Sequence, residues 1–289
     1  MHSKIRLFSL NIGLRSNLSD LMKIIADSKL DIIFLQEVRL TKIELSSKIE
    51  TLGFKCEVNI DSDEPLKPGT AVLWKSTLDV YEVTTLVTCR AQILLMDNYA
   101  LLNVYAPSGS SNRYERGIFF STDVFNGMIL HPDKSWVIGG DFNCLLQPID
   151  VEKGIGFSQK KCPQLENLVT AKNLKDVYRA FFPYKSEFTF FRSSAAPSRL
   201  DRFYFPDYLL PNVSRVCHLA SLSDHHGILV EVLLETDAIR QYIPKRRTFW
   251  KLNSRILADE DFLETFQNFG PIYNLVLDSI RILQIGGTV

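Results

Sequence analysis

The chain has 289 residues, enough for one large α/β domain or two small ones, and its 46% hydrophobic and 23% charged residues are typical of a globular protein. Its 33 basic and 33 acidic residues give zero net charge, so global charge lends no support to a nucleic-acid partner. The five cysteines include no Cys-x-x-Cys pair, which argues against a zinc site or a disulfide framework, and no apolar run is long enough to span a bilayer.

Hydrophobic periodicity predicts strands and helices over the first half of the chain. Period-two alternation or a continuous apolar run marks each strand, and apolar residues three or four apart mark each helix. In chain order these are a strand at Lys4–Leu10, a helix at Asn17–Ser28, a buried strand at Leu30–Leu35, a helix at Lys42–Leu52, strands at Thr70–Trp74, Val80–Val87, Gln92–Met96 and Tyr99–Tyr105, and a helix at Arg113–Met128.

The stretch Trp136–Asn143 organises the rest of the chain. Its short apolar run ends in Gly139-Gly140, which predicts a buried strand that reaches its C-terminal edge. Alternation along an extended backbone puts Asp141 and Asn143 on the same side. An acceptor beside an amide donor suits the positioning of a water molecule, although an Asx-rich turn without chemistry fits the pair equally well.

The second half of the chain contains further predicted helices and strands, and its amino-acid composition changes near its end. The predicted elements are a helix at Gln164–Asn173, strands at Glu187–Phe191 and Arg199–Phe205 around a loop at Ser193–Ser198, and strands at Val213–His218 and Gly227–Leu234. From Pro244 a basic run and an aromatic stretch follow, so we place a boundary near residue 240. Residues 1–240 then form one domain, and 241–289 form a linker-like tail with a helical segment at Asp259–Phe269. The order of elements predicts an α/β sandwich of mixed sheets.

Polar clusters follow five of the strand-like runs. They are Asn11, Glu37, Asp141 with Asn143, Asp201, and Asp224 with His225. Each one alone is more often a cap or turn residue, but together they indicate a site where strand ends meet. Carboxylates and amides with a histidine favour a hard cation, Mg²⁺ or Mn²⁺, over zinc. Such a cation beside a water-positioning pair points to hydrolysis of a phosphate ester.

Six short motifs occur in the order seen in the endonuclease/exonuclease/phosphatase superfamily, which the chain resembles over about residues 4–234. They are Ser9-Leu10-Asn11, Leu35-Gln36-Glu37, Asn103-Val104-Tyr105-Ala106-Pro107, Gly139-Gly140-Asp141-Phe142-Asn143, Ser198-Arg199-Leu200-Asp201 and Ser223-Asp224-His225. Single motifs are weak signals, but all six in order are strongly specific. Within that superfamily the chain looks most like the apurinic-type endonuclease domain of LINE-type non-LTR retrotransposons. Thr189-Phe190-Phe191 resembles that endonuclease, and Phe249–Asn253 resembles the start of the linker toward a reverse transcriptase.

This resemblance implies a DNase-like, four-layer α/β sandwich of two packed mixed β-sheets flanked by helices. It also implies Mg²⁺- or Mn²⁺-dependent nicking of one strand of double-stranded DNA in the nucleus for target-primed reverse transcription. A full-length element would carry a reverse transcriptase domain, which is absent from these residues. The alternatives are an inositol phosphate phosphatase, a sphingomyelin phospholipase, an abasic-site nuclease, or a decayed domain that only binds. Gly13 stands where abasic-site repair enzymes carry an acid, which argues mildly against that nuclease.

The resemblance also implies a role for each site residue. Glu37 would be the principal metal ligand, with Asn11 and Asp224 nearby, and Asp141 would position and deprotonate the attacking water. Asn143 and Tyr105 would hydrogen-bond the phosphate. His225, oriented by Asp201, would neutralise charge on the phosphate, and Thr189 and Ser223 would support the site. Pairing with Asp201 would favour the imidazolium form of His225, which suits that role.

Target choice requires residues outside the catalytic set, because the same acids hydrolyse any phosphodiester. The segment Phe191–Arg199 joins two predicted strands and is expected to project beside the cleavage site. Arg192 and Arg199 are predicted to enter a minor groove or to bind phosphates there. Val151 stands where many retrotransposon endonucleases show Arg, a departure that bears on DNA binding.

Overall fold

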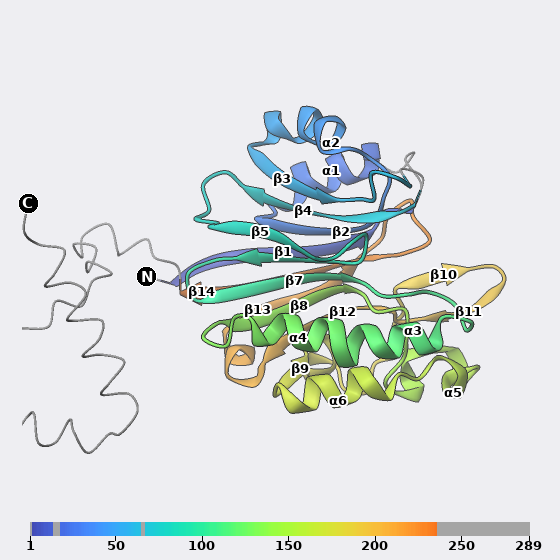
Figure 1. The fold of residues 1–289 in the computed structure, drawn as a ribbon. Coiled ribbons are helices and arrows are strands. Elements are labelled where there is room, and N and C mark those ends of the chain that lie inside the picture. Colours follow the sequence, from blue (N-terminus) through green and yellow to red (C-terminus); the bar gives the residue numbers. More distant parts are fainter. Residues whose placement is uncertain (1, 14–17, 65–66, 236–289) are drawn as a thin grey trace, which may run out of the picture. The chain divides into compact units, whose positions relative to one another are not determined.

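Two six-stranded β-sheets pack against each other in the computed structural model, which describes residues 2–13, 18–64 and 67–235 (Figure 1). The predicted boundary near residue 240 and the predicted helix at Asp259–Phe269 lie outside the described residues. Both therefore stay predictions.

The first sheet has the strand order β13-β14-β1-β2-β4-β3. Its strands are β1 His2–Asn11, β2 Ile32–Val38, β3 Phe54–Asn59, β4 Gly69–Lys75, β13 Val213–Leu219 and β14 Gly227–Glu235. β1 and β2 run parallel with Asn11 opposite Gln36, whereas β1 and β14 are antiparallel. This mixed sheet therefore brings the predicted residues Asn11 and Glu37 to the same edge.

The second sheet has the order β5-β6-β7-β8-β12-β9. Its strands are β5 Glu82–Val87, β6 Ala91–Leu95, β7 Tyr99–Tyr105, β8 Ser135–Asp141, β9 Leu174–Asp176 and β12 Asp201–Pro206. β7 and β8 are parallel with Tyr105 opposite Asp141, and β12 pairs antiparallel with β8 so that Asp201 also lies opposite Asp141. Three predicted site residues thus form one row across three strands.

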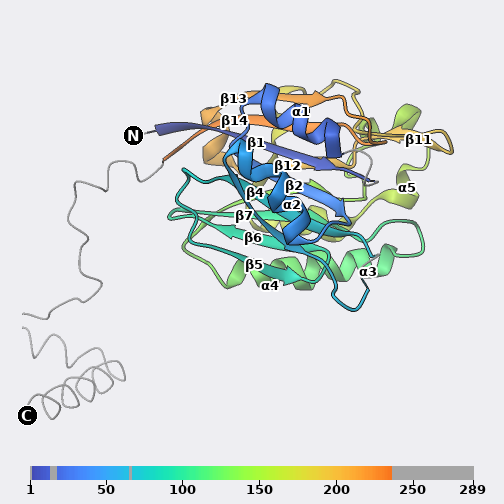
Figure 2. The same cartoon turned by 90° about the horizontal axis from the view of Figure 1, so that it is seen from above.

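Helices cover the outer face of each sheet (Figure 1), and Figure 2 shows the helices of the first sheet lying over its strands. They are α1 Leu18–Ser28, α2 Lys42–Ile49, α3 Arg113–Ile118, α4 Phe125–Ile129, α5 Phe157–Lys160, α6 Pro163–Ala171 and α7 Val177–Phe181. α1 and α2 pack on the first sheet, and the π-helical turn Phe119–Val124, α4 and α6 pack on the second. The predicted four-layer α/β sandwich is confirmed. No helix in the described ranges is long and apolar enough to cross a membrane.

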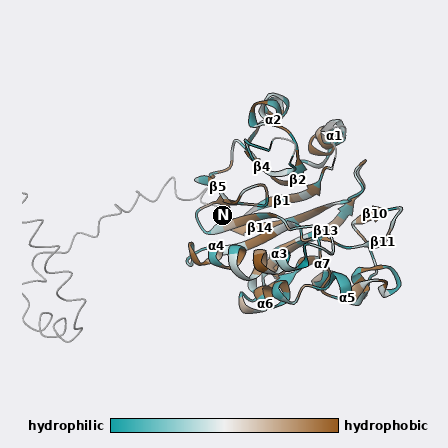
Figure 3. Cartoon of the chain, turned by 45° about the vertical axis from the view of Figure 1, so that its right-hand side comes forward, coloured by the Kyte–Doolittle hydropathy of each residue, from teal (hydrophilic) through white to brown (hydrophobic). Residues whose placement is uncertain are grey.

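Hydrophobic side chains of both sheets meet in a core between them, and hydrophobic residues are concentrated along the strands (Figure 3). Phe34 of the first sheet, for example, contacts Phe203 of the second with ring centroids 5.9 Å apart. A buried polar link joins the sheets as well, because Gln36 Nε2 donates to Asn103 Oδ1 at 2.8 Å. This satisfied link fixes the end of β2, which carries Glu37, relative to the second sheet.

The structure corrects the predicted hairpin that carried Thr189 and Asp201. β10 Phe190–Arg192 instead pairs with β11 Ala195–Ser198 in a separate two-stranded sheet, and Asp201 begins β12 of the second six-stranded sheet. The predicted loop Ser193–Ser198 is therefore mostly strand. Isolated bridges from Phe190 to His225 and from Val151 to Ser198 attach this hairpin to the loop before β14 and to the loop after β8. Sequence periodicity also missed the short elements β3, β9, α5 and α7.

Candidate active site

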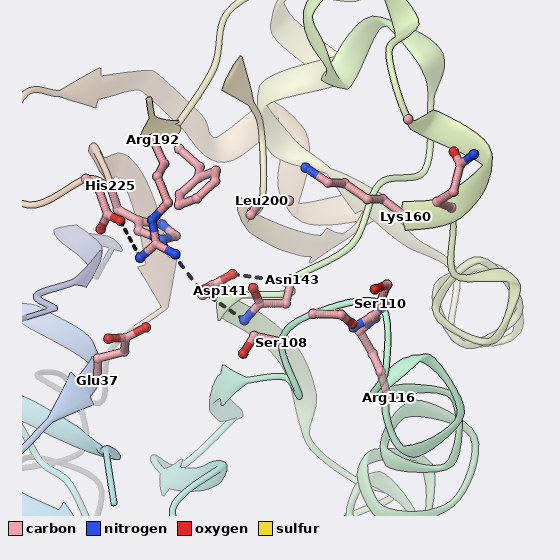
Figure 4. Close-up of a pocket in the computed structure, with 15 residues that line it drawn as sticks. Glu37, Ser108, Ser110, Arg116, Asp141, Asn143, Lys160, Arg192, Leu200 and His225 are labelled. Carbon is pink, nitrogen blue, oxygen red and sulfur yellow. Dashed lines mark hydrogen bonds and ion pairs between the residues drawn. The ribbon is translucent and has the colours of Figure 1, made fainter. Parts of the chain in front are cut away.

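A cavity of about 460 Å³ opens at one end of the two sheets (Figure 4). Its lining includes Glu37, Asp141, Asn143, Asp224 and His225, which come from three separate stretches of the sequence. The β10–β11 hairpin and α5 lie at the same end of the molecule (Figure 1). The structure therefore brings the residues of the predicted motifs together at one place.

Glu37 reaches this cavity because β2 is irregular at that point. The β2–β4 register shifts between Gln36 and Val38, and Glu37 has a φ of +56°. A left-handed backbone at a non-glycine residue costs on the order of 1–3 kcal/mol and is frequent at functional sites. Glu37 Oε1 accepts from Asn11 Nδ2 at 3.2 Å and from the Tyr105 hydroxyl at 3.1 Å, and Oε2 accepts no hydrogen bond from the described residues.

Asp141 is buried at the end of β8 and is surrounded by donors. Its Oδ2 accepts from Asn11 Nδ2 at 3.0 Å and from Asn143 Nδ2 at 3.2 Å, and its Oδ1 accepts from the Asn143 N–H at 2.9 Å. Asn143 has a φ of +48° and lies beyond the strand. The two residues are neighbours, as expected, but through this turn and not through strand alternation. Burial and the charge of Asp201 raise the pKa of Asp141 to about 6, which suits a general base.

His225 is held between two carboxylates. Its Nδ1 lies 2.8 Å from Asp201 Oδ2, which also accepts from Thr189 Oγ1 at 2.7 Å, and its Nε2 lies 3.9 Å from Asp141 Oδ2. Burial alone would lower the pKa of His225, but the charges of Asp201 and Asp141 outweigh it and raise that pKa to about 9. The imidazole is therefore cationic at neutral pH, as the sequence predicted.

Ser223 supports the same group through the backbone. Its hydroxyl donates to the Asn11 carbonyl at 2.8 Å and accepts from the His225 N–H at 3.2 Å. It thereby ties the loop before β14 to the end of β1. This placement agrees with the supporting position expected for Ser223.

The oxygen atoms near Glu37 fit a hard divalent cation. Glu37 Oε2 is open and faces a cavity that Asp224 also lines. The ligand atoms of Asp141, Asp201 and His225 lie within 4.8 Å of one another, yet the imidazole already binds Asp201 and both aspartates are buried. The Glu37 side therefore suits a hydrated divalent cation better than the buried Asp141–Asp201–His225 group does.

Asn11 faces this position with its amide nitrogen, which donates to Glu37 and Asp141. Its oxygen accepts from the Gly13 N–H at 3.0 Å. In this arrangement Asn11 holds the two carboxylates in place, and ligation of a metal by its oxygen stays a prediction.

The two arginines of the segment Phe191–Arg199 differ in their exposure to solvent. Arg192 lies at the cavity with its side chain 61% exposed and pairs with Asp224 at 3.1 Å. Arg199 is buried and pairs with Asp150 at 2.9 Å and with Asp176 at 2.6 Å. The prediction that Arg199 contacts DNA is therefore wrong, because its guanidinium is enclosed and its charge is already compensated.

The cavity also has residues that sequence reasoning did not single out. They are Ser108, Gly109, Ser110, Arg116, Gly156, Gln159, Lys160, Phe190 and Leu200. Arg116 Nη1 donates to the carbonyls of Pro107 and Gly109 and so shapes the loop after β7. Lys160 comes from a Lys-Lys pair, and no pattern in the sequence marks which lysine faces the site.

Comparisons with known proteins agree with this geometry. The chain matches the Endonuclease/Exonuclease/phosphatase family over residues 8–225. A Xenopus laevis protein, the Transposon TX1 uncharacterized 149 kDa protein, is 31% identical over 176 residues, covering 59% of this chain and 12% of that protein.

Solved structures share the fold. The 3′-5′ exonuclease NExo from Neisseria meningitidis has a TM-score of 0.67 at 18% identity, covering 79% of this chain and 99% of its own. The 3′ phosphatase NExo from Neisseria, bound to a product DNA hairpin, has a TM-score of 0.66 at 19% identity with the same coverage. Together with the family match, which extends over most of the chain, they confirm the resemblance inferred from the motifs. The chain therefore belongs to the endonuclease/exonuclease/phosphatase family.

Proposed function

We propose that the protein is a divalent-metal-dependent endonuclease that nicks one strand of double-stranded DNA, and that the nick primes reverse transcription of a non-LTR retrotransposon in the nucleus. The observation that carries this proposal is the enclosure of Asp141, Asn143 and the His225–Asp201 pair in one cavity with Glu37. The transposon relative supports the retrotransposon setting, and the DNA hairpin bound to the second structural neighbour supports a DNA substrate.

In this proposal each side chain performs the step for which its surroundings suit it. Asp141 orients a water molecule toward phosphorus and takes its proton. Asn143 and Tyr105 donate hydrogen bonds to the scissile phosphate, and Asn143 N–H contacts already hold Asp141 in position. His225, kept cationic by Asp201, stabilises the negative charge that grows on the phosphate as the bond breaks.

Glu37 would hold the metal, with Asp224 and Asn11 beside it. A bound Mg²⁺ or Mn²⁺ polarises a phosphoryl oxygen and stabilises charge on the leaving oxygen. The remaining part of the proposal is a reverse transcriptase supplied by the full-length element.

Conversion of supercoiled plasmid to nicked circles tests this function. We expect nicking with Mg²⁺ or Mn²⁺ and none with a chelator. Asp141→Ala and His225→Ala should each lower the rate about a hundredfold or more, since water activation and charge stabilisation each contribute at least that much. Full activity in either folded variant would refute the assignment. Binding without nicking would favour a decayed domain, and release of phosphate from an inositol phosphate would favour the phosphatase alternative.

A further inference from the structure

The cavity extends beyond the groups that perform the chemistry. In Figure 4, Asp141 and Asn143 lie between His225 on one side and Arg116 and Lys160 on the other. The far side is also lined by Ser108 and Ser110, which have no place in the mechanism above. This part of the cavity is therefore available for a portion of the substrate other than the reacting phosphate.

Lys160 is the cation in this cavity whose side chain has neither a carboxylate partner nor a hydrogen bond among the described residues. Arg192 pairs with Asp224, and Arg116 donates to two backbone carbonyls, but no carboxylate in the described part of the chain pairs with Lys160. Figure 4 shows its side chain pointing into the cavity. Burial lowers the pKa of Lys160 because part of its hydration is lost, and no acid restores it. An anionic ligand would supply the missing partner.

Backbone hydrogen bonds fix Lys160 relative to the catalytic loop. The Leu145 N–H, two residues after Asn143, donates to the Lys160 carbonyl at 2.9 Å, and the Lys160 N–H donates to the Gly156 carbonyl at 3.2 Å. A β-bridge between Leu145 and Lys161 adds to this attachment. The backbone that carries the Lys160 ammonium group is thus fixed relative to the segment that follows Asn143.

We propose that Lys160 binds the phosphodiester next to the scissile one on the strand that is cut, with Ser108 and Ser110 as neutral donors beside it. This inference rests on the proposed function. A cavity of about 460 Å³ lies within the range of small-ligand sites, roughly 300–1,000 Å³, and so holds more than one phosphate group. Lysine binds phosphate as a point charge and reads no bases. Lys160 therefore positions the strand so that the correct phosphate meets Asp141.

Binding of an uncut duplex in the presence of a chelator, together with steady-state nicking in Mg²⁺, tests this role. Lys160→Gln should weaken binding about tenfold at low salt and reduce the slope of log affinity against log salt by about one. KM for nicking should rise while kcat changes little, because the contact is present before and during the reaction. Lys160→Arg should retain most of the affinity.

Lys161→Gln is the matched control, because it removes the same charge one residue away. Lys161 pairs with Glu166 at 3.0 Å and does not line the cavity. Its loss should leave both the affinity and the salt slope unchanged. Equal behaviour of the Lys160→Gln and Lys161→Gln variants would overturn the inference.

A scan with single neutral methylphosphonates locates the contact. Placed at one position beside the nick on the cut strand, the modification should weaken binding of the unaltered protein about tenfold and cause no further loss in Lys160→Gln. If that variant stays as sensitive as the unaltered protein at every position, Lys160 does not bind a neighbouring phosphate. If the unaltered protein neither binds nor nicks the duplex, the proposed function fails and this inference fails with it.

Discussion

Glu37 and Asn143 have positive φ angles of +56° and +48° at the two positions where strand ends meet the cavity. Asparagine tolerates this conformation better than glutamate does, so the strain is greater at Glu37. The surrounding hydrogen bonds, from Asn11 and Tyr105 to Glu37 and from Asn143 to Asp141, maintain both conformations. The site is therefore organised before substrate binds, which is what charge stabilisation in a transition state requires.

Arg192 and Arg199 offer a matched test of exposure on one segment. Arg192→Gln should reduce the salt slope of DNA binding by about one and leave the free energy of unfolding nearly unchanged, because that side chain is 61% exposed. Arg199→Gln should instead cost on the order of 3–5 kcal/mol in unfolding free energy, since it removes a buried cation that pairs with both Asp150 and Asp176. Titration of duplex DNA and urea denaturation of both variants test this assignment. It is wrong if Arg199→Gln changes the salt slope of DNA binding and Arg192→Gln lowers the unfolding free energy.

β8 ends in Gly139, Gly140 and Asp141, and its neighbours leave no room for a side chain at either glycine. A Cβ at Gly139 would lie 2.2 Å from Phe203 Cε1, and one at Gly140 would lie 2.0 Å from the Val104 carbonyl oxygen of β7. The glycines therefore allow β8 to lie close to its neighbours, and Asp141 follows directly.

Gly140→Ala should therefore be severe. The added carbon meets backbone that cannot move without breaking the β7–β8 ladder, and the residue has a φ of +138°. We expect a loss of several kcal/mol in unfolding free energy, or no folded protein. Gly154→Ala is the control: its φ is +70° but the space around it is open, so only about 1 kcal/mol should be lost. Similar melting temperatures for the two variants would contradict this view of β8.

Asp150 connects distant parts of the molecule through buried ion pairs. It contacts Arg179 of α7, Arg199 after β11 and Arg202 of β12. Burial alone would raise the pKa of Asp150, but Arg199 and Arg202 outweigh burial and hold the pKa well below its usual range. The network joins the loop after the catalytic strand to the base of the hairpin.

This network predicts sensitivity to acid. The unfolded chain protonates Asp150 near the ordinary pKa of about 4, whereas the folded protein does so only at lower pH. The stability that Asp150 contributes is therefore fully present above about pH 5 and is lost as pH falls from there through the folded pKa. Asp150→Asn should lower unfolding free energy at pH 7 by about 3–5 kcal/mol and remove this acid-dependent part. A difference in unfolding free energy between the two proteins that stays the same at every pH would contradict this prediction.

The sequence was sufficient for the fold class and for the positions of most site residues, because period-two patterns and ordered motifs report strands and their ends. It was insufficient where a residue's partner lies far along the chain. Arg199 was predicted to contact DNA because nothing near it indicates Asp150, 49 positions earlier, as its buried partner. The short β10–β11 pair was missed for a related reason, since tertiary contacts and not local periodicity stabilise it.

The central claim is that Asp141 drives metal-dependent hydrolysis of a DNA phosphodiester. Single-turnover cleavage of an end-labelled duplex in Mg²⁺, with the Kd measured separately, tests it most directly. We expect Asp141→Asn, shown to be folded by circular dichroism, to cut about a hundredfold or more slowly with little change in Kd, and a chelator to abolish cutting by the unaltered protein. Cutting at the unaltered rate by this variant, or cutting that persists in the chelator, would contradict it.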